Sequence, residues 1–304
     1  MKRKKRSLFT LLMTLVLSLA AVGCGNNSAQ PKQEAPAANE VAKQISVGLI
    51  PAEAKVSDQA LEKFRTYLEQ QTGAKVTMGN YPDYNGVVEA MNAGKLDMAF
   101  LGPLTYVIAH HKGGARAIAA KTSKGVPYYY SYILVHQGAP YNTLDDLLKD
   151  SKNVDFAFGD INSTSGSLVP GVELKKRGVF RSKDDSDFKS VVYTGAHDVT
   201  ALSIQNKKVT AGAIDSSYYD KLVEQKKVDP TQFKKIWQSD RLFQYPFAVS
   251  KSVNDATAQK LQDALVNLKD KEVLDAFAAD GFVKASDQDY ASIRAVAEAD
   301  GRLK

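Results

Sequence analysis

Residues 156–174 read FAFGDINSTSGSLVPGVEL, and this stretch indicates both a local fold and a kind of site. A buried strand is expected over residues 154–160 and a helix over residues 165–178. The turn between them carries three consecutive hydroxyl residues, Ser163, Thr164 and Ser165. Hydroxyls and backbone N–H groups at the start of a helix can hold oxyanions. The alternative interpretation of this hydroxyl run is that it only caps the helix that follows. A cap needs only one hydroxyl, so the run favours an anion loop without excluding the cap.

The alternation of strands and helices extends along the chain on both sides of this loop. Strands are expected over residues 44–51, 74–82, 96–103, 154–160, 188–195, 209–216, 233–239 and 244–251. Helices are expected over residues 57–73, 84–95, 104–112, 165–178, 196–208, 217–228, 254–268 and 272–279. This pattern predicts an α/β fold with mixed, mostly parallel sheets flanked by helices. Because two such blocks follow one another, we expect two lobes with a ligand cleft between them.

The expected ligand loops follow from the order of the strands. Ligands of open α/β sheets bind beyond the carboxyl ends of the strands. The loops at those ends are residues 51–53, 81–84, 101–103, 160–165, 195–197 and 215–217. We therefore expect these six loops to line one cleft.

The first 43 residues predict export and attachment to a membrane. A basic block at residues 2–6 and an apolar run at residues 8–21 indicate a signal peptide over residues 1–23. The signal closes on LAAVGC (residues 19–24), which ends at Cys24, the only cysteine. This segment resembles a lipobox, although Ala21 stands where leucine is commoner. Cys24 is thus the expected lipidation site, with an unmodified cysteine as the alternative. Residues 24–43 have the composition of a flexible tether.

Charge and motif content exclude several classes of function. The formal charge of +6 comes mostly from the signal, since without residues 2–6 the chain has 35 Lys+Arg against 34 Asp+Glu. The balance and the lack of a known motif give no support to nucleic-acid binding. We find no nucleophile elbow and no zinc-protease motif, and the adjacent His110 and His111 make a poor chelate on a helix. We expect no enzyme activity, no metal and no cofactor.

Several longer segments resemble one known family in order and spacing. The segments are GDINSTSGSLVPG (159–171), YPDYNGVVEAMNAGKLDMAFLGPLTY (81–106), VPYYYSYILVHQGAPYNTLDDLL (126–148), TGAHDVTALSIQNKKVTAGAIDS (194–216) and IWQSDRLFQYPFAV (236–249). They resemble the phosphate, phosphite and phosphonate substrate-binding lipoproteins of ABC importers, from residue 47 to the last helices. This resemblance implies a type II periplasmic-binding-protein fold. It also implies a monomer, lipid-anchored outside the cell membrane, that delivers its ligand to a permease and its ATPase.

The resemblance implies boundaries for the lobes and roles for individual residues. Lobe 1 would comprise residues 44–134 plus 246–304, and lobe 2 residues 135–245. Residues 163–165 match the donors around the phosphonate oxygens. Tyr84 and Tyr129 match two tyrosines that reach these oxygens from the other lobe, and His197 matches a histidine near the anion.

Departures from the family pattern narrow the expected ligand. Members that bind aminoalkylphosphonates hold the ligand's ammonium with carboxylates, and at the matching positions this chain has Ser217 and Tyr245. We expect Asp215 to accept a hydrogen bond from a protonated ligand oxygen. Tyr245, with Phe247 and Leu101, would enclose a small P–H or P–CH3 group.

The expected ligand is thus phosphite or methylphosphonate, ahead of phosphate and larger phosphonates. A sulfonate or a vitamin phosphate is the alternative ligand on the same fold. A surface-anchored hydrolase is the remote alternative.

Overall fold

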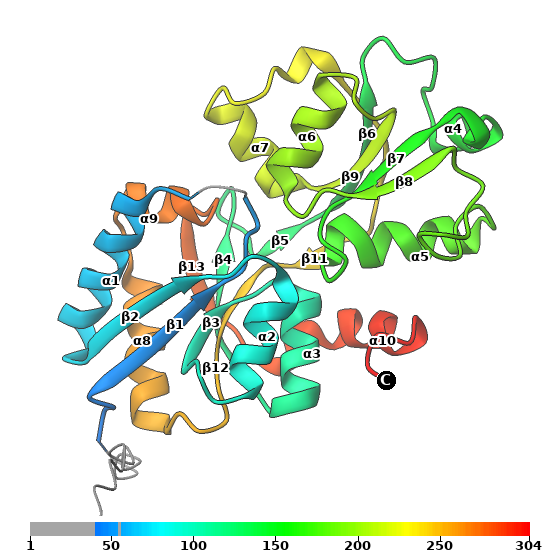
Figure 1. Cartoon of the computed structure of the whole chain (residues 1–304). Helices are drawn as coiled ribbons and strands as arrows, with labels where there is room; N and C mark the ends of the chain where they lie inside the picture. The colour runs from blue at the N-terminus through cyan, green and yellow to red at the C-terminus, as the bar shows by residue number, and fades with distance from the viewer. Residues whose placement is uncertain (1–39, 54–55) are drawn as a thin grey trace, which may run out of the picture. The chain divides into compact units, whose positions relative to one another are not determined.

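The computed structural model describes residues 40–53 and 56–304 (Figure 1). The predicted signal peptide, Cys24 and most of the tether lie outside the described residues.

A six-stranded sheet is built from both ends of this described part of the chain. Its strand order is β13-β4-β12-β3-β1-β2. The strands are β1 (Gln44–Leu49), β2 (Lys75–Asn80), β3 (Met98–Phe100), β4 (Arg116–Thr122), β12 (Pro246–Val249) and β13 (Gly281–Lys284). β1 pairs in parallel with β2 and β3, whereas β12 pairs antiparallel with β3 and β4, and β13 antiparallel with β4.

A five-stranded sheet is built from the middle of the chain, in the order β10-β6-β9-β7-β8. Its strands are β6 (Ser131–His136), β7 (Asp155–Phe158), β8 (Ser190–Tyr193), β9 (Ala211–Asp215) and β10 (Phe233–Gln238). β7 is parallel to β8 and β9, and β6 is antiparallel to β9 and β10. A short antiparallel ribbon of β5 (Tyr128–Tyr129) and β11 (Leu242–Phe243) lies where the chain passes between the sheets.

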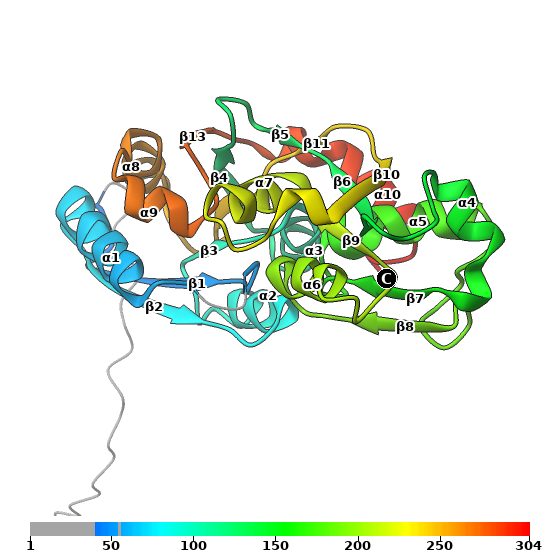
Figure 2. The same ribbon diagram turned by 90° about the horizontal axis from the view of Figure 1, so that it is seen from above.

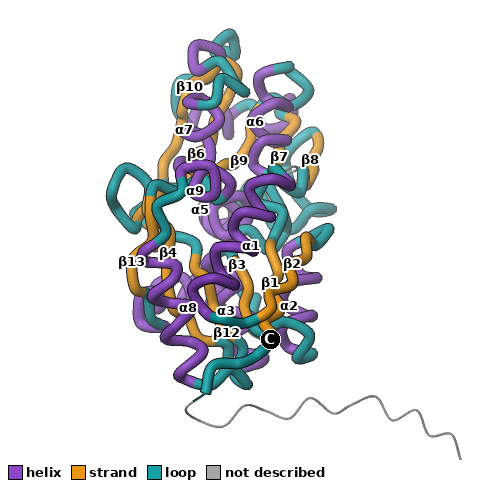
Figure 3. The backbone as a smooth tube through the Cα atoms, turned by 90° about the vertical axis from the view of Figure 1, so that its left-hand side faces the viewer, coloured by secondary structure: helices purple, strands orange, loops and turns teal. Residues whose placement is uncertain are grey.

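Helices cover both faces of each sheet. On the six-stranded sheet, α1, α8 and α9 pack on one face and α2 and α3 on the other (Figures 1 and 3). On the five-stranded sheet, α6 and α7 pack opposite α4 and α5 (Figure 2). The helices are α1 (Asp58–Thr72), α2 (Tyr84–Asn92), α3 (Pro103–Gly113), α4 (Leu144–Lys149), α5 (Val169–Lys176), α6 (His197–Gln205), α7 (Ser216–Glu224), α8 (Asp255–Asn267), α9 (Lys271–Ala276) and α10 (Ala291–Ala299).

The ends of α1 show why local sequence predicted this helix well. Ser57 caps the helix by accepting a hydrogen bond from the N–H of Ala60. Gly73 ends it in the left-handed region, at φ 74°, which glycine adopts without the steric cost of a Cβ. The predicted start and stop of this helix are confirmed.

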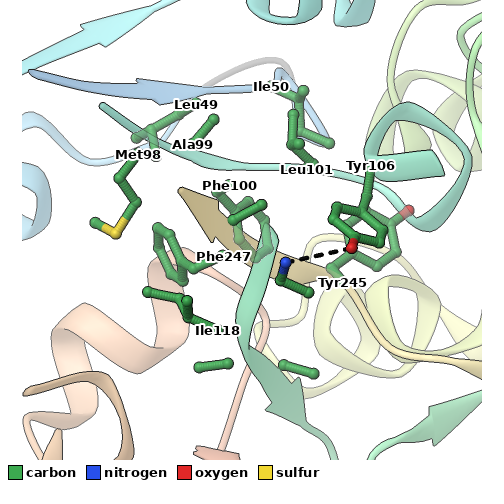
Figure 4. Packing of buried hydrophobic residues seen from close by; sticks show 14 of the residues in the cluster. Leu49, Ile50, Met98, Ala99, Phe100, Leu101, Tyr106, Ile118, Tyr245 and Phe247 are labelled. Atoms are coloured by element: carbon green, nitrogen blue, oxygen red, sulfur yellow. Dashed lines mark hydrogen bonds between the residues drawn. The ribbon is translucent and has the colours of Figure 1, made fainter. Parts of the chain in front are cut away.

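A continuous apolar run in its strands explains how the five-stranded sheet is held on both faces. In β6, Ile133 and Val135 join the core under α4 and α5, whereas Leu134 joins the core under α6 and α7. Successive strand residues point to opposite faces, so a strand covered on both sides needs a continuous apolar run. The six-stranded sheet has its own larger core, in which Phe100 and Phe247 pack at 5.1 Å between ring centroids (Figure 4).

The structure differs from the sequence-based expectation in three respects. The sheets are mixed as expected, but in each the parallel pairs are confined to three strands and the remaining pairs are antiparallel. Strands β4, β5, β6, β11 and β13 and helices α4 and α10 were not predicted. The helix after the hydroxyl run begins as a π-helix over Thr164–Leu168 before α5 continues it. In the described residues, no helix is both long and apolar enough to cross a membrane.

Candidate functional site

The hydroxyl loop between β7 and α5 is buried and internally braced. Ser163 caps the π-helix by accepting the N–H of Gly166 at 3.0 Å. Thr164 Oγ1 accepts the N–H of Leu104, at the start of α3, at 2.8 Å, so this contact joins the two sheets' loops. The backbone oxygen of Ser165 accepts the hydroxyl of Ser131 at 2.7 Å. A π-turn at such a position is typical of functional sites because it re-aims backbone and side-chain groups.

Tyr84 begins α2, on the six-stranded sheet, and faces this loop. Its N–H lies 3.4 Å from Oδ2 of Asp160, which follows β7, and this carboxylate also accepts the N–H of Asn162 at 2.7 Å. The Tyr84 side chain is buried, and this burial raises the pKa of its hydroxyl well above the ordinary value. Asp160, which sequence reasoning did not single out, therefore positions the tyrosine against the loop.

Asp215 ends β9 and caps α7 with only one of its carboxylate oxygens. Oδ1 accepts the N–H of Ser217 at 2.6 Å, the hydroxyl of Ser217 at 2.6 Å and the N–H of Tyr218 at 3.1 Å. Oδ2 is buried and has no hydrogen-bond partner among the described residues. The cap fixes the carboxylate while leaving one acceptor oxygen unused.

His197 and Tyr245 form a pair beside Asp215. His197 begins α6, and its N–H bonds to the carbonyl of Ala52, after β1, at 3.1 Å. Its Nε2 lies 3.0 Å from the Tyr245 hydroxyl, and its Nδ1 lies 3.4 Å from the N–H of Asp215. Because Nδ1 faces a donor, Nε2 carries the proton of the neutral ring. The Tyr245 ring packs beside Phe100 at the edge of the core, 5.8 Å between centroids (Figure 4).

Tyr129, in β5, completes the cluster from the ribbon between the sheets. Its ring packs on Tyr245 at 5.7 Å between centroids. Its hydroxyl is buried without a hydrogen-bond partner in the described part of the chain, and the same holds for Ser165 Oγ. Buried polar atoms are rarely left unpaired, so each one needs an explanation. Together with Asp215 Oδ2, the cluster thus offers two hydroxyl donors and one carboxylate acceptor to a bound group.

The structure brings all eight side chains that the sequence singled out into one buried cluster. Each has no more than 1% of its surface exposed. They are Tyr84, Tyr129, Ser163, Thr164, Ser165, His197, Asp215 and Tyr245. They come from the predicted loops at the strand ends, which include the hydroxyl loop, from β5 and from the residue just before β12.

Phe247, expected beside Tyr245 as a pocket wall, is instead a core residue. Its ring has four phenylalanine neighbours with centroids between 5.1 and 5.6 Å away. His110 and His111 lie at the end of α3, where Nδ1 of His110 contacts the carbonyl of Ala115 at 2.8 Å. Across the described ranges, no group of three or more His, Cys, Asp or Glu side chains could hold a metal ion.

A buried lysine that sequence reasoning missed adjoins the cluster. Lys121, in β4, is fully buried, and its Nζ donates to Ser217 Oγ at 3.1 Å and to the carbonyls of Phe277 and Ala278 at 3.2 Å. Both Ser217 and Tyr245 contact this ammonium, since Nζ also lies 5.0 Å from the centre of the Tyr245 ring.

Burial sets the protonation of the cluster. Burial raises the pKa of Tyr129 well above its ordinary value, and the negative charge of Asp215 adds to this effect. Burial lowers the pKa of His197 to about 4, against the opposing effect of Asp215. Burial lowers the pKa of Lys121 to about 8, although the negative charge of Asp215 acts to raise it. At neutral pH the tyrosine is therefore a hydroxyl donor, the imidazole is neutral and the lysine is mostly charged.

Known proteins share this fold and much of this sequence. Residues 47–290 match the family described as phosphonate ABC transporter, periplasmic substrate-binding protein. The phosphate-import protein PhnD of Mycolicibacterium smegmatis is 33% identical over 313 residues, which cover 95% of this chain and 94% of that one. The phosphonates-binding periplasmic protein of Escherichia coli is 31% identical over 86% of this chain and 78% of that one.

Solved structures agree with the architecture. A binding protein component of an ABC phosphonate transporter from Pseudomonas aeruginosa has a TM-score of 0.75 at 28% identity, over 86% of this chain and 87% of that one. PhnD1 from Prochlorococcus marinus, solved in complex with methylphosphonate, has a TM-score of 0.73 over 86% of this chain and 99% of that one; at 24% identity it bears on the fold alone. These neighbours are type II periplasmic binding proteins, which confirms the predicted fold class.

Proposed function

Because the chain belongs to the family of periplasmic substrate-binding proteins of phosphonate ABC transporters, we propose that it captures a small phosphorus oxyanion, with phosphite or methylphosphonate preferred. Members of this family are transport proteins and not enzymes, so the hydrolase alternative is dropped. They bind small ligands outside the cytoplasm and work with a permease and an ATPase.

The observation that carries the proposal is the set of unpaired buried atoms in the cluster. Tyr129 Oη, Ser165 Oγ and Asp215 Oδ2 are buried without partners among the described residues. A tetrahedral oxyanion supplies acceptors to the two hydroxyls. Hydrogen bonds to a charged group are worth about 1.5–3 kcal/mol each, which offsets the cost of burying these hydroxyls.

Asp215 supports a preference for oxyanions that carry a proton. Its Oδ1 is fully used by Ser217 and Tyr218, so only Oδ2 faces the ligand. A carboxylate oxygen repels an unprotonated anion but accepts the hydrogen of a P–OH group. Phosphite, methylphosphonate and phosphate present such a group near neutral pH, whereas sulfate does not. The close packing of the Tyr129 and Tyr245 rings favours a compact ligand.

We further propose closure of two lobes over the ligand, with lobe 1 at residues 44–134 plus 246–304 and lobe 2 at residues 135–245. Tyr84 would engage the anion from lobe 1 and the hydroxyl loop from lobe 2. The ligand would stabilise closure because it makes contacts in the closed state that an open one lacks.

The lipid anchor on Cys24 and the monomeric state also belong to this proposal. Replacing Cys24 with Ser should release the protein from the detergent phase of a Triton X-114 partition into the aqueous phase. Equal partition of the variant and the unchanged protein would contradict the anchor.

Ser165→Ala tests the ligand site most cleanly. Thr164 and Ser163 hydroxyls bond within the protein, whereas Ser165 Oγ does not, so its loss removes a ligand contact alone. We expect calorimetric affinity for methylphosphonate to fall by about 1.5–3 kcal/mol, or roughly 10- to 150-fold. Unchanged affinity would contradict the site, and tighter binding of a sulfonate or a vitamin phosphate than of any phosphorus oxyanion would favour those alternatives.

A further inference from the structure

The ammonium of Lys121 lies in a cage of a particular chemistry. It stands 4.1 Å from the centre of the Tyr218 ring and 5.0 Å from that of Tyr245. Its three hydrogens have three acceptors, which are Ser217 Oγ at 3.1 Å and the carbonyls of Phe277 and Ala278 at 3.2 Å. Aromatic faces together with neutral oxygens are how proteins bind ammonium groups. The cage is thus a cation site whose occupant is the protein's own side chain.

The cage shares residues with the anion cluster. Ser217 accepts from Lys121 and donates to Asp215 Oδ1 at 2.6 Å, so a two-bond relay joins the ammonium to the carboxylate. The ring of Tyr245 contacts the ammonium, and the hydroxyl of the same tyrosine contacts His197. The cation position therefore lies one hydroxyl away from the carboxylate that faces the ligand.

We propose that Lys121 is a specificity-determining residue, which excludes ligands that bring their own ammonium group by occupying the cation position beside the anion site. This inference rests on the proposed function and deepens it. A ligand with an aminoalkyl tail meets a site already filled and a like charge at short range. A ligand with a hydrogen or a methyl group meets neither obstacle.

Among the acidic side chains that act on the Lys121 ammonium, which are Asp215, Glu53 and Asp280, the one buried oxygen without a partner in the described residues is Asp215 Oδ2, and this oxygen belongs to the anion cluster. Asp215 Oδ1 is saturated by its cap contacts and by the Ser217 hydroxyl. Glu53 is paired with Lys227 at 2.8 Å, and the two oxygens of Asp280 accept the Thr122 hydroxyl and the N–H of Gly125. A ligand ammonium could thus gain a charged partner only by taking Asp215 Oδ2 from the phosphorus group, and would otherwise be buried unpaired, which is strongly unfavourable.

The test compares two ligands in two variants. Lys121→Ala empties the cage, and Lys121→Met removes the charge but keeps much of the volume. We measure calorimetrically the ratio of the Kd for 2-aminoethylphosphonate to that for methylphosphonate. We expect this ratio to fall at least about tenfold in Lys121→Ala and by a smaller factor in Lys121→Met. Lys235→Ala is the control, since it removes another lysine that lies over a ring, 4.5 Å from that of Tyr132, away from the cluster.

A ratio that stays within about twofold in both Lys121 variants, with methylphosphonate still bound, overturns the inference. A second measurement is independent of phosphonate binding. Ethylammonium chloride should raise the Tm of Lys121→Ala above its value in equal sodium chloride, and should not do so for the unchanged protein. If the Tm does not rise, the interpretation of the cage as a cation site is wrong. If the unchanged protein binds no phosphonate, the proposed function is wrong. The ethylammonium result would then still decide whether Lys121 occupies a cation site.

Discussion

Removing the hydroxyl of Tyr129 should separate ligand affinity from stability. The hydroxyl is buried and has no hydrogen-bond partner in residues 40–53 and 56–304. Tyr129→Phe therefore breaks no bond within the protein, and the ring contact with Tyr245 at 5.7 Å is kept. Because the raised pKa keeps this hydroxyl protonated, it is a donor to an anionic ligand.

The expected magnitudes follow from these contacts. Loss of one hydrogen bond to a charged group costs about 1.5–3 kcal/mol, so the Kd for methylphosphonate should rise roughly 10- to 150-fold. The free energy of unfolding of the ligand-free protein should fall by no more than about 0.5 kcal/mol, or should rise, because an unpaired buried polar group is removed.

Tyr290→Phe is the matched control. Tyr290 is equally buried, but its hydroxyl donates to the carbonyl of Gln244 at 2.9 Å. Its loss should lower the free energy of unfolding by about 1 kcal/mol or more and leave affinity nearly unchanged. Calorimetry gives the Kd for methylphosphonate of each variant, and urea unfolding gives the free energy of unfolding of each. A Tyr129→Phe protein that loses stability but keeps its affinity would refute the assignment of Tyr129 to the ligand.

Three further predictions concern selectivity, acid stability and closure. Asp215→Asn should narrow the affinity gap between methylphosphonate and sulfate, because the amide donates where the carboxylate repels; an unchanged gap in calorimetry would refute the acceptor role. His197 titrates at about 4 in the folded chain against 6.5 ordinarily, so the unfolded state binds more protons between these values and stability falls as the pH drops through this window. His197→Gln should therefore reduce the stability lost between pH 7 and 4.5 by on the order of 3 kcal/mol, and an identical loss in urea unfolding would contradict this cause. Lys227 pairs with the buried Glu53 at 2.8 Å, and this ion pair joins loops of the two sheets. Lys227→Met should therefore weaken ligand binding by about 1 kcal/mol. Lys189→Met is the control, because it breaks an ion pair within one sheet and should leave affinity unchanged. Equal effects of the two lysine variants on affinity would argue against a closure contact.

Sequence alone predicted which residues gather in the candidate site because their loops lie at predictable places. A loop after a strand is located by hydrophobic periodicity, and the rule for the ends of strands then groups loops that are distant in sequence. His197 and Asp215 are examples, since each lies where a strand passes into a helix, and the structure buries both within the cluster. Caps such as Ser57 are equally local and were predicted correctly.

Features that depend on tertiary contact were not predictable in the same way. The hydroxyl loop looked like a helix start, but in the structure it forms a π-helix that is hydrogen-bonded to Leu104 and Ser131, both distant in sequence. Strand β4 was missed because RAIAAKT contains small residues and two cations, which mask the alternation. All of its residues after Arg116 are buried, and only the neighbouring carbonyls and rings reveal that a lysine is tolerated at position 121.

The most direct test of the central claim is a calorimetric titration of the unchanged protein with phosphite, methylphosphonate, phosphate and sulfate at neutral pH. The account predicts binding of phosphite and methylphosphonate, weaker binding of phosphate and no measurable binding of sulfate. Sulfate binding as tight as that of methylphosphonate, or no binding of any phosphorus oxyanion, would contradict it.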